Sequence, residues 1–352
     1  MKIALVNDTH FGARNDSILV NEYFFKFWEQ IFFPYLKEHD IKTVVHLGDV
    51  VDRRKFINFK IADDFRLRWL SRFESEGIDL HLLVGNHDTY YKNTNRVNSL
   101  QNLCNVGQIY VDPAEVRFDG VDVLLLPWIC ADNYNESVNM IKSTKAEIVF
   151  GHLEISGFEM DKGNVCHEGM DRAMFERFDM VLSGHFHHEQ TDGLIYYLGN
   201  QYEITWADYN DNRGFHVFDT DTRELTFVPN PYKLFFKFVY DDKDDLTFEK
   251  LEEINFDQYA GTYVKVLVVN KTNPYLFDKF MEEMNRCSPI DINVIEDTID
   301  LTDMQDDDTI EQAEDTVTIL NKYVDGLTLN TDNERLKGIL REIYVEALNT
   351  EV

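Results

Sequence analysis

Short apolar runs separated by polar and glycine residues dominate the first two thirds of the 352-residue chain. Two longer stretches between the early runs, at about Asn21–Glu38 and Phe59–Glu76, repeat apolar residues at helical spacing and predict helices. The short runs predict β-strands at Ile3–Asn7, Thr43–Leu47, Leu80–Val84, Val121–Leu126, Glu147–Phe150, Met180–Ser183, Tyr196–Leu198, Phe215–Asp219 and Leu225–Pro229. Strand, polar motif, helix and strand in this order predict βαβ units with parallel strands.

The later apolar runs follow one another with short connections and few helical stretches. We therefore expect the sheet to become antiparallel there, because only antiparallel strands can be joined by tight turns. Two stacked sheets flanked by helices fit the whole pattern. The expected fold is α/β with four layers, α/β/β/α, over residues 1–230.

The pattern changes after Pro229-Asn230-Pro231, where a small α+β unit without a cluster of metal ligands is expected over residues 231–295. Its predicted elements are strands at Lys233–Tyr240, Tyr263–Val269 and Asp291–Ile295 and a helix at Pro274–Arg286.

An acidic stretch separates this unit from the end of the chain. Residues 296–308 hold seven Asp or Glu in thirteen positions, which is typical of a linker. Two amphipathic helical patterns occupy most of 309–352, at roughly Asp308–Asp325 and Thr331–Leu348. Such helices cannot bury their apolar faces alone, so we expect them to pack on the rest of the chain or on a partner.

The acidic charge of the chain is unevenly distributed. The formal net charge is −30, which taken alone disfavours a nucleic-acid partner. Residues 1–100 hold 14 Lys and Arg against 14 Asp and Glu, whereas residues 101–352 hold 20 against 50 and carry the whole −30. DNA can therefore meet the neutral third of the chain, although the rest repels polyanions.

The sequence shows no sign of export. The start, MKIALVNDTHFG, reads as a strand entering a polar motif and lacks the features of a signal peptide. No run approaches the roughly eighteen apolar residues of a membrane span. The four cysteines, Cys104, Cys130, Cys166 and Cys287, have no CxxC spacing. We expect reduced thiols in a cytoplasmic protein without a membrane partner.

Five polar motifs each follow one of the apolar runs: Asp8-Thr9-His10, Gly48-Asp49, Gly85-Asn86-His87-Asp88, Gly151-His152 and Gly184-His185-Phe186-His187. Side chains at the carboxyl ends of parallel strands gather along one edge of a sheet. The motifs supply seven candidate oxygen or imidazole ligands, with His87 in addition. This is about the number that two divalent metals need, and paired metals can hold a phosphate and activate water.

The spacing within the motifs indicates how the ligands divide. Asp8 and His10 are two residues apart, so on a strand they would point the same way and share one metal. His185 and His187 repeat this spacing, so that one can face each metal, and the two oxygens of Asp49 can bridge both ions. Glycine precedes most ligands, as expected where the backbone turns sharply off a strand. The remaining histidines are expected to be packing or surface groups, namely His39, His46, His81, His167 and His216.

Together, the motifs Asp-x-His, Gly-Asp, Gly-Asn-His-Asp, Gly-His and Gly-His-x-His resemble the signature of the calcineurin-like metallophosphoesterases. Within that family the chain is similar to the SbcD-type DNA repair nucleases, especially their phage-encoded members. The similarity includes Leu125-Leu126-Pro127-Trp128, Gly151-His152-Leu153-Glu154 and Arg213-Gly214-Phe215. It is good over residues 1–230, weaker over 231–295, and limited to the architecture beyond.

The resemblance implies a role for each candidate residue. The first metal would be held by Asp8, His10, Asp49 and His187, and the second by Asp49, Asn86, His152 and His185. Two manganese ions are implied, with magnesium as the alternative. His87 would protonate the leaving 3′-oxygen or orient the phosphate, and Asp88 would orient His87.

One motif departs from the pattern of the family. Asp52 stands where many SbcD-type nucleases carry a histidine that helps to position the substrate. The stretch from Gly48 to Arg53 instead resembles a motif of protein Ser/Thr phosphatases, whose arginine contacts phosphate. We expect Asp52 to hold Arg53 against a DNA phosphate, and a DNA contact would also involve Arg54 and Lys55. A solvated turn at these three basic residues is the alternative.

The implied function is metal-dependent hydrolysis of DNA phosphodiester bonds, as exonuclease and endonuclease, in recombination and double-strand-break processing. The unit over 231–295 would cap the site and steer DNA, and the helices of 309–352 would bind an SbcC-type ABC ATPase. Two copies of the nuclease chain would dimerise within a heterotetramer. The aromatic stretch Tyr23–Tyr35 is a candidate dimer face, although it can equally be ordinary core. The complex would act in the bacterial cytoplasm, that of an infected host if phage-encoded.

Three other functions share part of these features. A protein Ser/Thr phosphatase is favoured by Asp52-Arg53, but that family usually has Glu at the position of Asp88 and lacks the paired Gly-His-x-His. A small-molecule phosphodiesterase shares every motif, yet it needs no linker and no docking helices. A scaffold without catalysis is disfavoured by the intact set of ligands.

Overall fold

The computed structural model describes residues 1–161, 163–243 and 245–296. The two predicted tail helices, and the predicted acidic linker from residue 297 on, lie outside this range. Within it, none of the helices has the length and apolar character that a membrane crossing requires. The four cysteines are free thiols, as predicted.

The first of two six-stranded sheets has the order β16-β15-β1-β2-β3-β6. Its strands are β1 (Lys2–Val6), β2 (Thr43–His46), β3 (Asp79–Leu83), β6 (Gln108–Tyr110), β15 (Gly214–Asp219) and β16 (Leu225–Pro229). β1, β2, β3 and β6 are parallel, whereas β15 and β16 pair antiparallel. The predicted βαβ rhythm of the early chain and its later antiparallel strands are both confirmed here.

The second sheet has the order β13-β14-β12-β9-β8-β7. Its strands are β7 (Ala114–Phe118), β8 (Val121–Leu126), β9 (Ile148–His152), β12 (Met180–Gly184), β13 (Gln190–Thr191) and β14 (Ile195–Tyr197). The expectation of antiparallel pairing is wrong for the centre of this sheet, where β8, β9, β12 and β14 are parallel. The connections are long enough to return the chain, because α7 (Tyr134–Ser143), η3 (Arg172–Phe175) and the β10–β11 pair lie within them.

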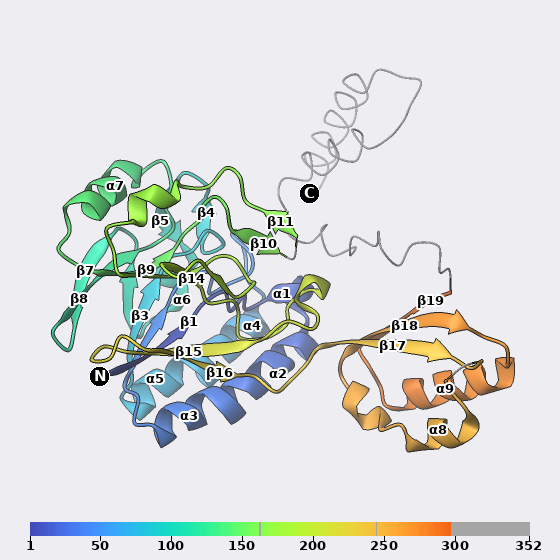
Figure 1. Cartoon of the computed structure of the whole chain (residues 1–352). Coiled ribbons are helices and arrows are strands. Elements are labelled where there is room, and N and C mark those ends of the chain that lie inside the picture. The colour runs from blue at the N-terminus through green and yellow to red at the C-terminus, as the bar shows by residue number, and fades with distance from the viewer. Residues whose placement is uncertain (162, 244, 297–352) are drawn as a thin grey trace, which may run out of the picture. The chain divides into compact units, whose positions relative to one another are not determined.

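Alternating side chains build the layers on the two faces of the first sheet. In β1, Ile3 and Leu5 enter the apolar cluster shared with the second sheet, whereas Ala4 and Val6 enter the cluster beneath the helices. Helices α2 to α5 lie along the outer face of the first sheet (Figure 1), and α7 and η3 pack on the second. The predicted α/β/β/α order of layers is present.

Two long helices, interrupted in the middle, cover the first sheet. The first consists of α2 (Ile18–Phe27), η1 (Trp28–Phe32) and α3 (Phe33–Glu38), and the second of α4 (Phe59–Asp64), η2 (Phe65–Leu70) and α5 (Ser71–Glu76). The η1 and η2 segments are π-helical, and the aromatic rings of Trp28 and Trp69 pack edge to face beneath them. Both predicted helices are confirmed. Most aromatic side chains of the stretch Tyr23–Tyr35 are buried and belong to the core, and a dimer face at this stretch stays a prediction.

Three short segments lie close to the ends of the parallel strands. A bent turn of helix, α1 (Ala13–Asp16), follows the first polar motif. A hairpin of β4 (Thr89–Tyr91) and β5 (Thr94–Asn98) follows the third motif and leads into α6 (Ser99–Leu103). The 3₁₀ helix η4 (Trp206–Asp208) precedes β15.

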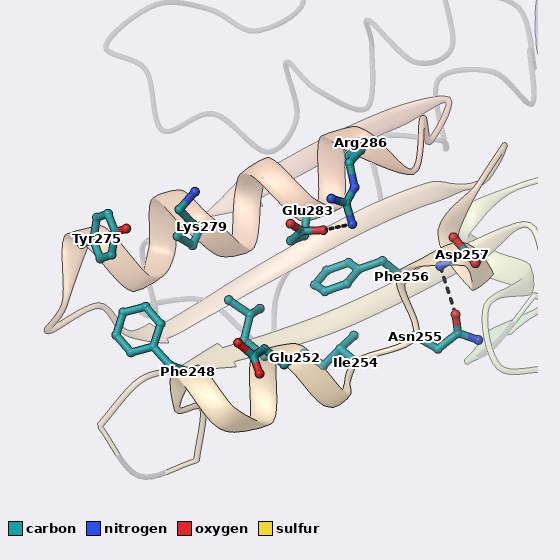
Figure 2. A pocket seen from close by; sticks show the side chains of 11 residues that line it. Phe248, Glu252, Ile254, Asn255, Phe256, Asp257, Tyr275, Lys279, Glu283 and Arg286 are labelled. Carbon is teal, nitrogen blue, oxygen red and sulfur yellow. Dashed lines mark hydrogen bonds and ion pairs between the residues drawn. The ribbon is translucent and has the colours of Figure 1, made fainter.

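The segment from residue 235 to 295 forms a separate three-stranded parallel sheet. It consists of β17 (Phe235–Asp241), α8 (Phe248–Glu253), η5 (Phe256–Tyr259), β18 (Tyr263–Asn270), α9 (Pro274–Arg286) and β19 (Asp291–Ile295). Its own apolar cluster includes Tyr240, Val266, Phe280 and Met284. Figure 2 shows the groove between α8 and α9, whose rim carries the ion pair of Glu283 with Arg286. The division into units at 1–230 and 231–295 remains a prediction.

Candidate metal centre

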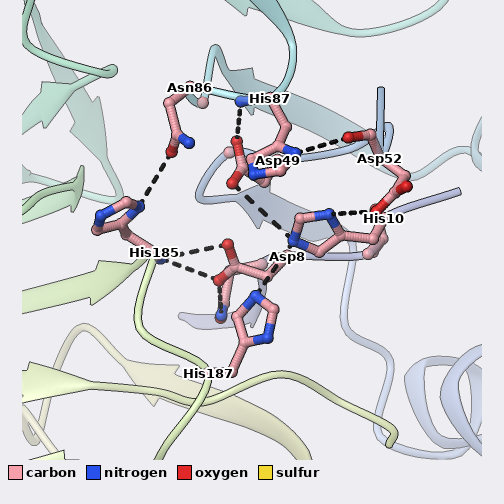
Figure 3. A network of polar contacts seen from close by, with 12 residues as sticks. Asp8, His10, Asp49, Asp52, Asn86, His87, His185 and His187 are labelled. Carbon is pink, nitrogen blue, oxygen red and sulfur yellow. Dashed lines mark hydrogen bonds and ion pairs between the residues drawn. The ribbon is translucent and has the colours of Figure 1, made fainter. Parts of the chain in front are cut away.

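The five polar motifs converge from both six-stranded sheets. Asp8, Asp49 and Asn86 follow the carboxyl ends of β1, β2 and β3, which are neighbours in the first sheet. His152 ends β9 and His185 follows β12, which are neighbours in the second sheet. The side chains meet where the two sheet edges face each other (Figure 3).

One group of donors consists of Asp8, His10 and His187, whose ligand atoms all lie within 4.8 Å of one another. The Nε2 atoms of His10 and His187 are only 3.1 Å apart. The carboxylate of Asp8 accepts the backbone amide of His185 at 3.0 Å, which joins the first sheet's loop to the second sheet's loop. All three predicted ligands of this group are therefore brought together.

The second group consists of Asp49, His152 and His185, also within 4.8 Å. Oδ1 of Asn86 lies 2.8 Å from Nε2 of His152 and 3.0 Å from Nδ1 of His185. Oδ2 of Asp49 is 3.3 Å from Nε2 of His152 and 3.9 Å from Nε2 of His10. Asp49 is thus the one predicted ligand among the described residues whose carboxylate lies between both groups, as a bridging role requires.

The charges inside this cluster favour bound cations. Burial lowers the pKa of His152, but the carboxylate of Asp49 outweighs this and raises the pKa to about 9. Burial also lowers the pKa of His10, but the carboxylates of Asp52 and Asp49 outweigh this and raise the pKa to about 9. Burial lowers the pKa of His185 to about 3. Without metal, two buried imidazoles therefore hold protons where two cations with nitrogen and oxygen ligands fit.

The hydrogen bonds of His152 fix which of its nitrogens faces the cluster. Its Nδ1–H donates to the backbone oxygen of Leu47 at 2.7 Å. Nε2 is left to face the oxygens of Asn86 and Asp49. A neutral ring places a lone pair against two acceptor oxygens, which is unfavourable unless a proton or a metal cation lies between them. The donor set thus fits divalent metals.

Left-handed backbone carries four of the ligands. Asp8, His10, Asp49 and His185 have φ angles of 49°, 43°, 57° and 87°, which residues other than glycine rarely adopt. Asp8 and His10 lie beyond the end of β1, so strand alternation is the wrong explanation for their shared group. Backbone turns after the strands, held by hydrogen bonds, direct these side chains instead.

Close packing of the loops explains the glycine at position 85. A Cβ atom there would lie 2.2 Å from the backbone nitrogen and Oδ1 of Asp49. Gly48 is required for two reasons: its φ of +99° is unfavourable for other residues, and a Cβ would lie 2.5 Å from Nδ1 of His152. The predicted sharp turn therefore applies to Gly48, whereas Gly85 is required by the approach of two ligand loops.

Asp88 does not orient His87, which corrects the predicted role. Its buried carboxylate accepts four backbone amides, those of Asp49, Val50, Val51 and Gly85, at 2.8–3.1 Å. Burial and the nearby Asp49 raise the pKa of Asp88 to about 7, against the effect of the amides. Asp88 ties the loop after β2 to the loop after β3 and so positions the bridging aspartate.

His87 is oriented by a backbone carbonyl. Its Nδ1–H donates to the backbone oxygen of Asp52 at 2.6 Å, and its amide donates to Oδ1 of Asp49 at 2.7 Å. The ring lies edge to face against His10, with centroids 4.8 Å apart. The carboxylate of Asp52 lies 3.3 Å from Nδ1 of His10. Asp52 thus contacts the ligand His10 with its side chain and the candidate acid His87 with its backbone.

Arg53 is not held by Asp52, which corrects a second expectation. Its guanidinium donates to Oδ2 of Asp16 at 3.1 Å and to Oδ1 of Asn15. Nη1 of Arg54 is buried without a hydrogen-bond partner among the described residues. The ammonium of Lys55 lies 5.9 Å from the ring centre of Tyr90. The three basic side chains therefore diverge from one turn.

His46 supports the loops of the first and second motifs, a role that was not recognised in the sequence. His46 was expected to be a packing or surface group, but its Nδ1 accepts the amide of Gly48 at 3.2 Å, and its Nε2 lies 3.1 Å from Oγ1 of Thr9. The Thr9 hydroxyl donates to the backbone oxygen of Val50 at 2.9 Å. Burial lowers the pKa of His46 to about 3, so the ring is neutral. Its place two residues before Gly48 was the available signal.

A segment after β14 also supports the ligand loops. Gln201 donates to the backbone oxygen of Asn7 at 2.8 Å. The hydroxyl of Tyr202 donates to the backbone oxygen of Thr9 at 2.7 Å. Arg213 is buried and donates to the backbone oxygen of His187 and to Asp208. The sequence signal for Gln201 and Tyr202 was absent, because their partners lie more than 190 positions away.

Comparisons with known proteins agree with this geometry. Residues 1–189 match the model of the calcineurin-like phosphoesterase family. The chain is 29% identical to "Exonuclease subunit 1" of Enterobacteria phage T4 over 354 aligned residues, which cover 99% of each protein. It is 25% identical over 222 residues to the SbcD component of the nuclease SbcCD from Staphylococcus epidermidis, covering 52% of this chain and 57% of that protein. The protein of the same name from Staphylococcus saprophyticus is 23% identical over 201 residues, with shares of 54% and 51%.

Proposed function

This chain belongs to the calcineurin-like phosphoesterase family, and on that premise we propose that it is the nuclease subunit of a DNA-processing complex. It would hydrolyse DNA phosphodiester bonds as exonuclease and endonuclease during recombination and double-strand-break processing. The observation that carries the phosphoesterase chemistry is the position of Asp49 between two buried donor groups. The names of the T4 and staphylococcal relatives, an exonuclease subunit and two nuclease subunits, support a nucleic acid as the substrate, and DNA is the one we propose.

The proposed ligands follow the two donor groups. Asp8, His10, Asp49 and His187 would hold one ion, and Asp49, Asn86, His152 and His185 the other. Manganese is proposed because imidazole and carboxylate ligands are mixed, and magnesium is the alternative. When bound, the ions supply positive charge for the phosphate and lower the pKa of a coordinated water.

His87 is the proposed general acid. With Nδ1–H bound to the carbonyl of Asp52, the ring presents Nε2 for proton transfer. A proton held at Nε2 can pass to the leaving 3′-oxygen while Nδ1–H stays bonded to the carbonyl. Asp88 and His46 do not touch substrate in this proposal; they hold the loops that carry Asp49 and His10.

DNA phosphates next to the site would contact basic residues of the turn after Asp52. Arg54 and Lys55 are the better candidates, because Arg53 is already paired with Asp16. Arg54→Ala should then weaken DNA hydrolysis roughly tenfold without loss of bound manganese. Arg53→Ala serves as the matched control from the same turn, and an equal loss for both variants would contradict this division.

The other components and units are also part of the proposal. The unit over 231–295 would cap the site, and residues 309–352 would bind an SbcC-type ABC ATPase. A homodimer within a heterotetramer would use exposed apolar residues of the helical layer, Leu19, Phe59 and Leu67. Such a complex would act in the cytoplasm of a bacterium, or of an infected host. Deletion of 305–352 should abolish ATPase binding and leave the manganese content unchanged.

The test is manganese-dependent release of nucleotides from linear duplex DNA, with and without the ATPase. A phosphopeptide and a cyclic nucleotide are the competing substrates, which represent a protein phosphatase and a small-molecule phosphodiesterase. We expect DNA hydrolysis that His87→Gln reduces at least roughly a hundredfold while manganese remains bound. DNA that stays intact under all conditions would exclude the nuclease function.

A further inference from the structure

Two exposed tyrosines stand beside the metal centre. Tyr90 and Tyr91 lie in β4, which begins directly after Asp88, and they are 41% and 51% exposed. Their ring centres are 4.7 Å apart, with the planes at 73° to each other. The catalytic scheme above uses neither ring. Large aromatic side chains this close in the chain to His87 therefore need a different explanation.

The hairpin that carries the tyrosines is firmly attached to the ligand loops. The backbone oxygen of Asp88 accepts the amide of Ser99 at 2.8 Å, where the hairpin closes. Asn95 donates to the backbone oxygens of Val111 and Trp128 at 3.1 and 2.7 Å. The backbone that carries the two rings is therefore held in a fixed relation to Asp88 and the bridging aspartate that Asp88 positions.

Positive charge accompanies the rings. The ammonium of Lys55 lies 5.9 Å from the ring centre of Tyr90, and Lys92 follows Tyr91 and is exposed. Neither lysine has an ion-pair partner within the part of the chain that the structure describes. In a protein of net charge −30, uncompensated lysines next to exposed rings mark a surface suited to a polyanion.

We propose that Tyr90 and Tyr91 form a stacking surface for unpaired bases of the strand that enters the metal centre, with Lys55 and Lys92 contacting its phosphates. This inference rests on the proposed nuclease function and refines its substrate class. Bases of a paired duplex hide their faces in the stack, whereas unpaired bases can stack on aromatic rings. The enzyme would therefore select DNA ends with unpaired nucleotides over blunt ends.

The experiment measures binding of a fluorescent single-stranded oligonucleotide to the full-length chain. The buffer contains calcium ions and has one fixed salt concentration. Each base is replaced in turn by an abasic residue, and the series is repeated with Tyr90→Ala and Tyr91→Ala. Tyr90→Phe and Tyr91→Phe keep the ring without the hydroxyl. Tyr134→Ala removes a tyrosine of similar exposure, 49%, from helix α7, outside the hairpin, and is the matched control.

Stacking predicts that removal of one base near the strand end weakens binding roughly tenfold in the unmodified protein, but not in the Ala variants. The Phe variants and Tyr134→Ala should behave like the unmodified protein. Equal effects of the abasic residues with and without the tyrosines would overturn the inference, and so would Ala variants that bind every oligonucleotide as before. A chain that neither binds nor hydrolyses DNA would instead refute the proposed nuclease function itself.

Discussion

The edge of the two large sheets and the three-stranded unit of residues 235–295 are ordered by different forces. At the sheet edge, buried carboxylates, imidazoles and amides hold one another, and several ligands have left-handed backbone. In the three-stranded unit, helices α8 and α9 cover one sheet through an apolar cluster around Phe280. Polar contacts place side chains accurately, whereas apolar contacts mainly stabilise a fold.

The sequence distance of the contacts differs as well. Asp8 depends on Gln201 and on the amide of His185, so the metal centre requires most of the first 213 residues to be folded. The three-stranded unit closes within about sixty residues, through parallel pairing of β17, β18 and β19. Damage to each region should therefore give different results, which four measurements can separate.

The largest effect is expected from Asp49→Ala. Loss of the carboxylate that lies between both donor groups should lower the hydrolysis rate on the order of 10⁴-fold, or about 5 kcal/mol. Bound manganese should also fall, as measured by metal analysis after dialysis. Asp278→Ala, the same change at an exposed site in the three-stranded unit, should alter neither quantity. Full activity of Asp49→Ala would refute the two-ion arrangement.

Phe280→Ala tests the apolar side of the comparison. The ring is fully buried and packs against Phe238, Tyr240 and Phe256, so its loss should cost about 3–5 kcal/mol of folding free energy. Hydrolysis of a small phosphodiester such as bis-p-nitrophenyl phosphate should stay within about twofold. Tyr275→Ala, at an exposed position of the same helix, should change the folding free energy by less than about 0.5 kcal/mol. Loss of small-diester hydrolysis in Phe280→Ala would show that the two regions depend on each other.

The third measurement is the pH dependence of metal affinity. His10 and His152 have pKa values raised to about 9 in the metal-free protein, so at pH 7 both protons must leave before their nitrogens bind metal. The apparent affinity should therefore rise with pH and level off above about 9. Between pH 7 and 8 the gain should be roughly tenfold to a hundredfold, for one or two protons released. Calorimetry in buffers of different ionisation enthalpy counts these protons, and a count of zero would contradict the assignment.

The smallest effect is expected from Asp88→Asn. One carboxylate oxygen is replaced by an amide donor that faces backbone amides, so the two ligand loops lose part of their connection. Metal affinity should fall roughly 10- to 100-fold, as is usual for residues that position ligands. The pH dependence of catalysis should keep its shape, because His87 is held by the carbonyl of Asp52. A changed acidic limb of the pH profile would contradict this and support the role predicted from the sequence, in which Asp88 orients His87.

Most of the strands and the chemically important motifs could be predicted from the sequence. Predicted strands such as Val121–Leu126 and Leu225–Pro229, and the helix Pro274–Arg286, have the predicted boundaries, because their apolar pattern is strong. Helix α7 was missed because few of its residues are buried, namely Ser137 and Ile141. The parallel centre of the second sheet was missed for the same reason, since α7 is part of the crossover that makes it possible.

The site shows the same division between local and distant information. Each ligand motif could be recognised because it follows a strand and contains its own donors. The contacts of the supports could not, because Gln201 and Arg213 bind backbone atoms of Asn7 and His187, and even the noted stretch Arg213-Gly214-Phe215 gives no sign of such a partner. Asp88 was noticed but given the wrong partner, since spacing cannot tell whether a carboxylate faces a ring or four amides.

The contact at Gly85 has a consequence for the dimensions of the centre. Because the loop of Asn86 touches the loop of Asp49 through a residue without a side chain, main-chain atoms set how far apart these two ligand positions lie. Exchange of one ligand for another then changes the affinity for an ion but leaves this spacing of the two loops unchanged. Single ligand replacements can therefore change the metal preference of the centre, while the spacing of Asn86 and the bridging aspartate is inherited unchanged with the backbone.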